Sequence, residues 1–198
     1  MRDLMICSLI GVLSLVLGCG GADKADQGYA ATVTTDPATA ATDVLDPPFT
    51  SEQIRDAWVE GLELKIRRQT DGMEVLERWR VVAADSDGAT IESVVIDAAG
   101  EAVSEPRAQT SSWDELRDHA AFPADRVRRE AVNRETALGA FDGRLYTVTD
   151  PESGTFSEYF FAEAFPGAPL VMRVIKDGEV VAQFEQIERG RFGDGEGS

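Results

Sequence analysis

The hydrophobic pattern of the chain begins with a run of mostly apolar residues at positions 4–17. A helix of this length would span about 21 Å, which is short of the roughly 30 Å hydrocarbon core of a bilayer. Such a length is typical of the apolar region of a signal peptide rather than of a membrane span. We therefore predict that residues 1–18 form a signal peptide.

Two short helices are predicted from their N-terminal sequences. Thr50 with Gln53, and Ser112 with Glu115, have the spacing of capping boxes, in which two side chains satisfy free N–H groups of the first turn. Apolar residues recur at helical spacing after each pair. Pro123 is expected to end the second helix.

Outside these helices, apolar and polar residues alternate as they do in a strand with one buried face. Leu62, Leu64 and Ile66 start this pattern, residues 73–83 repeat it, and residues 89–97 form a more mixed third run. These three segments are predicted to be strands.

Tight turns are predicted between these strands. The dipeptides Asp71-Gly72 and Asp87-Gly88 stand at the two breaks. Both dipeptides favour the positive φ angles of a short hairpin. The three strands are therefore expected to pair antiparallel.

Residues 124–138 allow two interpretations. By propensity alone they could form a helix that ends at Gly139. The alternative is a pair of strands at 127–137 and 140–149. We prefer the strands because of a resemblance to known proteins.

Residues 127–189 resemble the C-terminal half of bacterial envelope lipoproteins of half-barrel architecture. Those chains commonly run through a strand, a Gly-x-Phe corner, a strand, a hairpin, an aromatic strand, a Pro- or Gly-rich turn and two closing strands. The matching segments, in the same order from the corner onward, are residues 139–141, 145–148, 150–154, 159–161, 165–167, 170–175 and 180–187. The group includes carriers of lipoprotein acyl chains and many domains without an assigned activity. The resemblance therefore implies a fold and no catalytic residue.

Together these patterns predict an α+β fold. We expect a strongly curved, half-barrel-like antiparallel sheet of about seven or eight strands, with two short helices against one face. A single domain is expected at residues 50–189. Residues 190–198 are mostly glycine and acid, and we predict a disordered tail there.

The end of the signal peptide adds a lipid anchor to this picture. Residues 16–19, Val-Leu-Gly-Cys, resemble the lipobox of bacterial lipoproteins. The resemblance implies cleavage before Cys19 and acylation of its thiol and of the new N-terminus; the alternative is an ordinary secretory signal with a cysteine nearby. Residues 19–49 would be the lipidated cysteine and a flexible linker. The expected location is the bacterial cell envelope, and Gly20, where Asp would suggest inner-membrane retention, favours the outer membrane.

Charge and cysteine content exclude several classes of function. The formal net charge of −17 disfavours nucleic acid as a partner. Cys7 would leave with the signal peptide and Cys19 would be acylated, so a thiol nucleophile, a zinc–thiolate site and a redox pair are not expected. The predicted partners are the membrane, through the anchor, and another envelope protein or a hydrophobic ligand.

The remaining polar residues give no convincing catalytic or metal site, and no cofactor is predicted. His119 is the single histidine, but no Gly-x-Ser-x-Gly motif accompanies it. Asp85, Asp87 and Glu92 are too few for a calcium loop, so we interpret residues 85–88 as a turn.

One basic cluster and one aromatic set stand out. The basic cluster could bind an anion, but acidic residues interleave with it, so we interpret it as the solvated side of an edge strand; it comprises Arg126, Arg128, Arg129 and Arg134. The aromatic residues could line a ligand pocket or simply form the core, and the core is the commoner case. The candidate ligand-binding residues are Trp58, Trp79, Trp113, Tyr146, Phe160 and Phe161.

The sequence therefore favours a non-enzymatic binding or assembly module anchored to a membrane. One alternative is a carrier that holds an acyl chain in the concave face of the sheet. A second alternative is a carboxylate-dependent hydrolase, because 36 acidic residues supply many possible pairs.

Overall fold

The computed structural model describes residues 43–192. The predicted signal peptide, Cys19, most of the predicted linker and residues 193–198 lie outside the described residues. Within them, the chain already contacts the domain before Thr50, since the Leu45 N–H donates to the Phe122 carbonyl (3.0 Å) and Phe49 is buried. At the other end, the last strand continues to Arg191.

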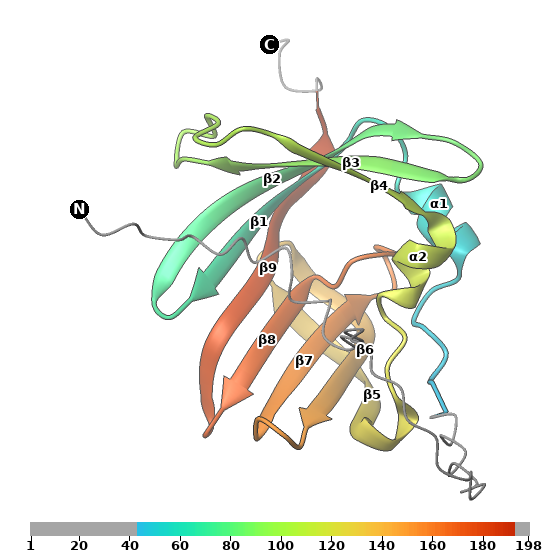
Figure 1. Ribbon diagram of the computed structural model, residues 1–198, viewed down its shortest axis with the longest axis vertical. Coiled ribbons are helices and arrows are strands. Elements are labelled where there is room, and N and C mark those ends of the chain that lie inside the picture. Colours follow the sequence, from blue (N-terminus) through green and yellow to red (C-terminus); the bar gives the residue numbers. More distant parts are fainter. Residues whose placement is uncertain (1–42, 193–198) are drawn as a thin grey trace, which may run out of the picture. The chain divides into compact units, whose positions relative to one another are not determined.

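A curved antiparallel sheet forms most of this fold (Figure 1). The nine strands found between residues 43 and 192 have the order β4-β3-β2-β1-β9-β8-β7-β6-β5. Their bounds are β1 (Leu62–Thr70), β2 (Met73–Ala84), β3 (Gly88–Ile96), β4 (Arg107–Ser112), β5 (Val127–Thr136), β6 (Gly139–Asp150), β7 (Thr155–Ala162), β8 (Val171–Lys176) and β9 (Glu179–Arg191). The predicted fold class is confirmed, with nine strands in place of seven or eight. The additional strand is β4, whose largely polar sequence gave no signal.

Two helices, α1 (Ser51–Ala57) and α2 (Trp113–Asp118), lie together on one side of the curved sheet (Figure 1). Both predicted capping boxes are present. The Ser51 hydroxyl donates to the Asp114 carboxylate (2.6 Å), which joins the two helix starts. Helix α2 ends at Asp118 rather than at Pro123, and a short 3₁₀ turn, η2 (Ala124–Arg126), leads into β5.

The helices pack on what we call the inner face of the sheet, the face that carries Leu62, Leu64 and Ile66. These three side chains are at most 7% exposed, as their alternation in the sequence predicts. They belong to one core cluster that also includes Trp58 of the α1 end and Trp113 of α2. The inner face beneath the helices is therefore the main core.

The two predicted tight turns have different physical causes. Asp71 and Gly72 have φ angles of 50° and 78°, as expected for a short hairpin. At the second turn the prediction of positive φ is wrong, because Gly88 is not among the residues with positive φ. A Cβ at Gly88 would instead overlap the backbone carbonyl of Ser111 in the neighbouring strand. This glycine is needed for close approach of two strands.

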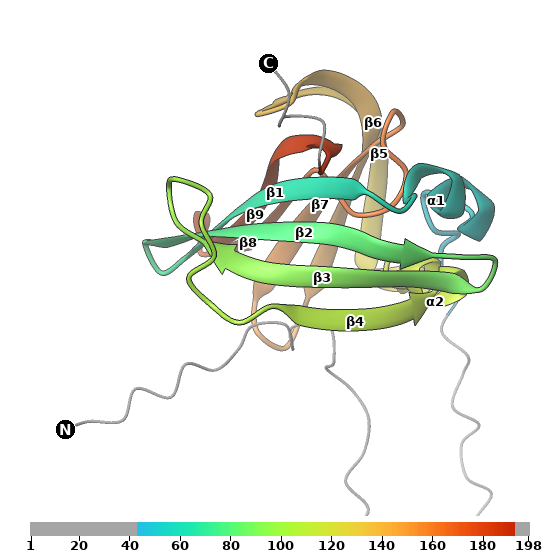
Figure 2. The same ribbon diagram turned by 90° about the horizontal axis from the view of Figure 1, so that it is seen from above.

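Residues 127–136 and 139–150 form the β5–β6 hairpin, so the preference for strands over a helix is confirmed. The tip of this hairpin curls over the sheet (Figure 2). There the Ala137 N–H donates to the Glu185 carboxylate of β9 (3.1 Å). The hairpin covers a second, smaller core on the outer face of the sheet, formed by Phe160, Ala162, Leu170 and Val171 with Val132, Leu138, Phe141, Leu145 and Phe165.

Candidate functional site

The structure brings five of the six candidate aromatic residues into the inner-face core. Trp58, Trp113, Tyr146 and Phe161 are buried, and Trp79 packs against them while partly exposed. Phe160 is the exception. It lies in the outer-face core, because adjacent strand residues point to opposite faces and Phe161 points inward. The alternation of strand β7 could have shown this in the sequence.

The buried aromatic rings contact one another directly. The ring centroids of Tyr146 and Phe161 are 5.5 Å apart, those of Phe122 and Tyr146 are 5.5 Å apart, and those of Phe49 and Phe161 are 6.3 Å apart. Such separations are typical of packed aromatic pairs in a core. The rings fill the space between the sheet and the helices.

Hydrogen bonds fix the two helix-associated tryptophans in this core. The Trp58 indole N–H donates to the Pro166 carbonyl (2.9 Å), and the Trp113 indole N–H donates to the Asp85 carbonyl (3.1 Å). Both indoles are at most 5% exposed. Both side chains are therefore held in place within the core.

Tyr146 gives a prediction for stability. Its hydroxyl is fully buried and has no hydrogen-bond partner among the described residues, which is unfavourable. Tyr146→Phe is expected to raise the free energy of unfolding by about 1 kcal/mol, measured by denaturant titration. Tyr159→Phe is the matched control, because the Tyr159 hydroxyl is not one of the buried groups without a hydrogen-bond partner among residues 43–192, and its loss should not raise stability. A marked loss of stability in Tyr146→Phe would contradict this account.

Beyond Ile66 the inner face continues without cover from α1 or α2. Along β1, Arg68 is paired with Val75 and Phe184, and Thr70 is paired with Met73 and Ala182. Residues paired in this way share a face of the sheet. The next strand continues the row, with Met172 opposite Phe184 and Val174 opposite Ala182.

We call this part of the inner face the open apolar surface, and define it by Met73, Val75, Met172, Val174 and Ala182. Met73 is 70% exposed and Val75 is 39% exposed, while the other three are partly buried. The alternation in β2 correctly places Met73 and Val75 on the inner face, although the sequence did not show that they lie beyond the covered core. Exposed apolar side chains that continue into partly buried ones on the same face are a feature of binding surfaces.

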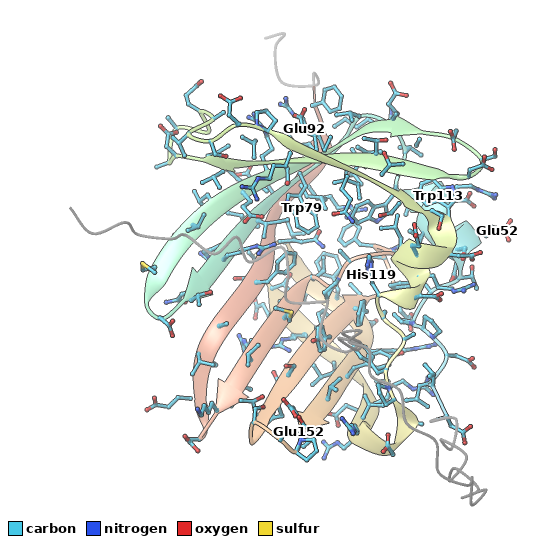
Figure 3. The ribbon with its side chains drawn as sticks, in the orientation of Figure 1. Glu52, Trp79, Glu92, Trp113, His119 and Glu152 are labelled. Carbon is cyan, nitrogen blue, oxygen red and sulfur yellow. The ribbon has the colours of Figure 1, made fainter. Side chains whose placement is uncertain are left out.

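A polar pair borders the open apolar surface on strands β1 and β2, next to Val75. The guanidinium of Arg68 lies 3.2 Å from the Glu77 carboxylate, and both side chains are largely buried. Glu77 also accepts a hydrogen bond from the Trp79 indole (3.0 Å), and Trp79 lies inside the curve of the sheet (Figure 3). Glu77 interrupts the apolar pattern of β2, and this ion pair explains why a charge is tolerated there.

A small depression beside the start of α1 is lined by the candidate residue Phe161. Its volume is about 190 Å³, and Pro48, Phe49, Gln53 and Arg144 share the lining. Pockets that enclose drug-sized or lipid-like ligands usually measure about 300–1,000 Å³. This depression is therefore too small for an acyl chain.

The residues considered for catalysis or metal binding are dispersed. His119 is exposed just after α2, and Glu92 lies on β3, away from it (Figure 3). The Asp85 carboxylate accepts hydrogen bonds from the N–H groups of Asp87 and Gly88, which lower the pKa of Asp85 and make residues 85–88 a turn. No group of three or more His, Cys, Asp or Glu residues between 43 and 192 is placed to hold a metal ion.

A carboxylate-dependent hydrolase would need buried carboxylates. Among residues 43–192, Glu185 is a buried acidic residue. Glu185 lies on the outer face, 2.6 Å from the Arg67 guanidinium, and it also accepts the Ala137 N–H. These partners satisfy the charge. Glu52 on α1 and Glu152 in the β6–β7 turn stand apart from it on the surface (Figure 3).

Three of the four arginines of the basic cluster have local acidic partners, and Arg129 is exposed. Arg128 contacts Glu130 (3.1 Å), Arg134 contacts Glu158 (3.8 Å), and Arg126 reaches Asp125 at 4.0 Å. Burial together with the nearby charge of Arg173 lowers the pKa of Arg134. Arg128, Arg129 and Arg134 lie on β5, which is an edge strand of the sheet, and Arg126 lies just before it. Charged side chains on such an edge oppose pairing with another sheet.

None of the helices between residues 43 and 192 has the length and apolar character needed to cross a membrane.

Comparisons with known proteins support the fold alone. No family model matches the chain, and no curated protein is similar to it. Among solved structures, MucB in complex with the periplasmic part of MucA has a TM-score of 0.50 at 13% identity, over 70% of this chain and 53% of that one. The MucA/MucB complex of Pseudomonas aeruginosa has a TM-score of 0.47 at 15% identity, over 70% and 54%.

A candidate lipoprotein from Parabacteroides distasonis is also similar, with a TM-score of 0.41 at 9% identity over 67% of this chain and 96% of that one. This chain spans about half the length of the MucB structures that it matches. The structure itself defines the class of fold, an open and strongly curved antiparallel sheet with helices on its inner face. A protein described as exported and one described as a lipoprotein are among the structures that resemble it.

Proposed function

We propose that this chain is a non-enzymatic binding module of the bacterial cell envelope, anchored through lipidated Cys19. Its binding site would be the open apolar surface, and its ligand an extended apolar segment of another envelope protein. The observation that carries the proposal is the 70% exposure of Met73 on the same face as the buried core. Exposed apolar side chains arranged in this way gain free energy when a partner covers them.

A protein partner is supported by the comparison with MucB. MucB has been solved in complex with the periplasmic part of another protein, MucA. The shared fold supports a protein ligand for this chain as well. The net charge of −17 adds a preference for a partner with basic residues beside its apolar segment.

The carrier alternative has weaker support. The open apolar surface could contact a hydrophobic ligand, but a carrier must also shield its ligand from water. The candidate aromatic residues pack in two cores instead of lining a chamber. An acyl chain on this sheet would keep much of its length in water.

The proposal predicts a specific contact that can be tested in living cells. A photo-crosslinking amino acid at position 73 should produce one defined adduct with an envelope protein, because Met73 lies on the proposed surface. The matched control is position 74, the adjacent residue, which points to the opposite face of β2. Adducts are detected as slower bands on a denaturing gel and identified by mass spectrometry.

Adducts from position 74 but not from positions 73 and 75 would contradict the proposal. Adducts with lipid alone from position 73 would favour the carrier alternative.

A further inference from the structure

Arg189 of β9 is an arginine without an acidic partner. It forms no ion pair with any carboxylate of residues 43–192, and its polar contact is the Gln186 side-chain oxygen at 3.5 Å. Its guanidinium stacks on the Phe165 ring, 4.9 Å from the centroid. Burial lowers the pKa of Arg189, which reflects the cost of holding this charge away from water.

The burial of this unpaired guanidinium, rather than the missing ion pair alone, sets Arg189 apart. There are 36 acidic residues against 19 basic ones, so acidic partners are abundant. Other arginines of the sheet use them closely, as Arg67 does with Glu185 and Arg80 with Glu63, both at 2.6 Å. A partly buried guanidinium without a counter-charge is unfavourable unless a ligand supplies one.

An open depression lies beside Arg189. Its volume is about 550 Å³, within the range of small-molecule sites. Its apolar side is formed by Ala57 at the end of α1, Leu62 of β1, Leu138 at the β5–β6 tip and Phe165. Arg189 and Arg191 supply the charged side, and no ion pair of Arg191 is found within the described chain.

We infer that this depression binds a small amphiphilic carboxylate, with its apolar body against Leu62, Leu138 and Phe165 and its carboxylate at Arg189 and Arg191. The planar guanidinium can donate two parallel hydrogen bonds to a carboxylate, which a single ammonium cannot match. The apolar walls select a ligand with a hydrocarbon or aromatic body over a bare anion.

The site is separate from the open apolar surface. Leu62 begins β1, whereas Met73 is paired with Thr70 at the opposite end of that strand. The two sites can therefore be tested independently, and this inference does not rest on the proposed protein partner.

The test uses two probes of nearly equal shape, 4-phenylbutyrate and the uncharged 4-phenylbutanol. Each is titrated by calorimetry into the full chain carrying Cys19→Ala, so that no detergent competes for the site. The carboxylate is expected to bind with one-to-one stoichiometry, and about tenfold or more tightly than the alcohol.

Variants assign the binding to the depression. Arg189→Gln is expected to weaken phenylbutyrate binding about tenfold or more, and Arg191→Gln by several-fold, while phenylbutanol binding changes little in both. Arg129→Gln, at an exposed arginine on strand β5, is the control and should bind phenylbutyrate like the parent chain. Circular dichroism melting shows whether each variant is folded.

No detectable phenylbutyrate binding, equal binding of acid and alcohol, or unchanged binding in Arg189→Gln would each overturn the inference. If Arg189→Gln does not fold, Arg191→Gln and the acid–alcohol difference decide the outcome. Arg191 is exposed at the end of β9, so its substitution leaves the core intact.

Discussion

Gly143→Ala is expected to destabilise the domain by about 3 kcal/mol or more, enough to unfold much of it at growth temperature. Gly143 lies in β6 between Val132 of β5 and Ala162 of β7. A Cβ at this position would overlap the Phe161 carbonyl and lie 2.8 Å from the Phe160 ring. The carbonyl belongs to the backbone of the neighbouring strand, so the clash cannot be relieved by a rotamer change. Thermal melting should show a midpoint lowered by roughly 6–12 °C.

Gly190→Ala is the matched control for this substitution. Gly190 is also a strand glycine, but no atom lies within 4 Å of the position that its Cβ would take. Its substitution should change stability by about 0.5 kcal/mol or less. Equal stability of the two variants would show that β6 and β7 do not approach each other as closely as described.

Local sequence signals predicted the local elements of this fold. Thr50 and Ser112 begin helices because their side chains and their partners three residues later satisfy backbone N–H groups at the helix starts. Leu62, Leu64 and Ile66 share the buried face of β1 because side chains alternate along a strand. Each of these features depends on residues close together in the chain.

Features that depend on distant residues were not predictable in this way. Strand β4, residues 107–112, is mostly polar because most of its side chains are exposed, and it is defined by pairing with β3. The contact of Ala137 with Glu185 joins segments 48 residues apart. The second core under the β5–β6 hairpin also joins residues far apart in the chain, from Val132 to Val171.

The candidate site shows the same limit. The sequence identified the aromatic residues of the core but not which part of the inner face lies uncovered. Met73 and Val75 have the alternation of buried residues, and they are exposed only because β2 extends beyond the helices. The sequence did not identify Arg189 as a site residue either. The absence of a carboxylate near its guanidinium is a property of the folded chain.

Cys19→Ala is expected to release the protein from the membrane. Cys19 is the position where the lipobox-like residues 16–19 end, and its acyl chains would be the anchor. Two or three acyl chains hold a protein stably on a bilayer, whereas none leaves only weak contacts. Fractionation of cells should therefore move the protein from the membrane pellet to the soluble fraction. Cys7→Ala is the matched control and should remain with the membranes, because that cysteine would be removed with the signal peptide.

The mass of the N-terminal peptide of the wild-type protein, purified from membranes, tests the anchored envelope module most directly. The account predicts a mature chain that starts at Cys19 and carries the added mass of acyl chains. A full-length chain that still begins at Met1, or a cleaved chain with an unmodified Cys19, would contradict it.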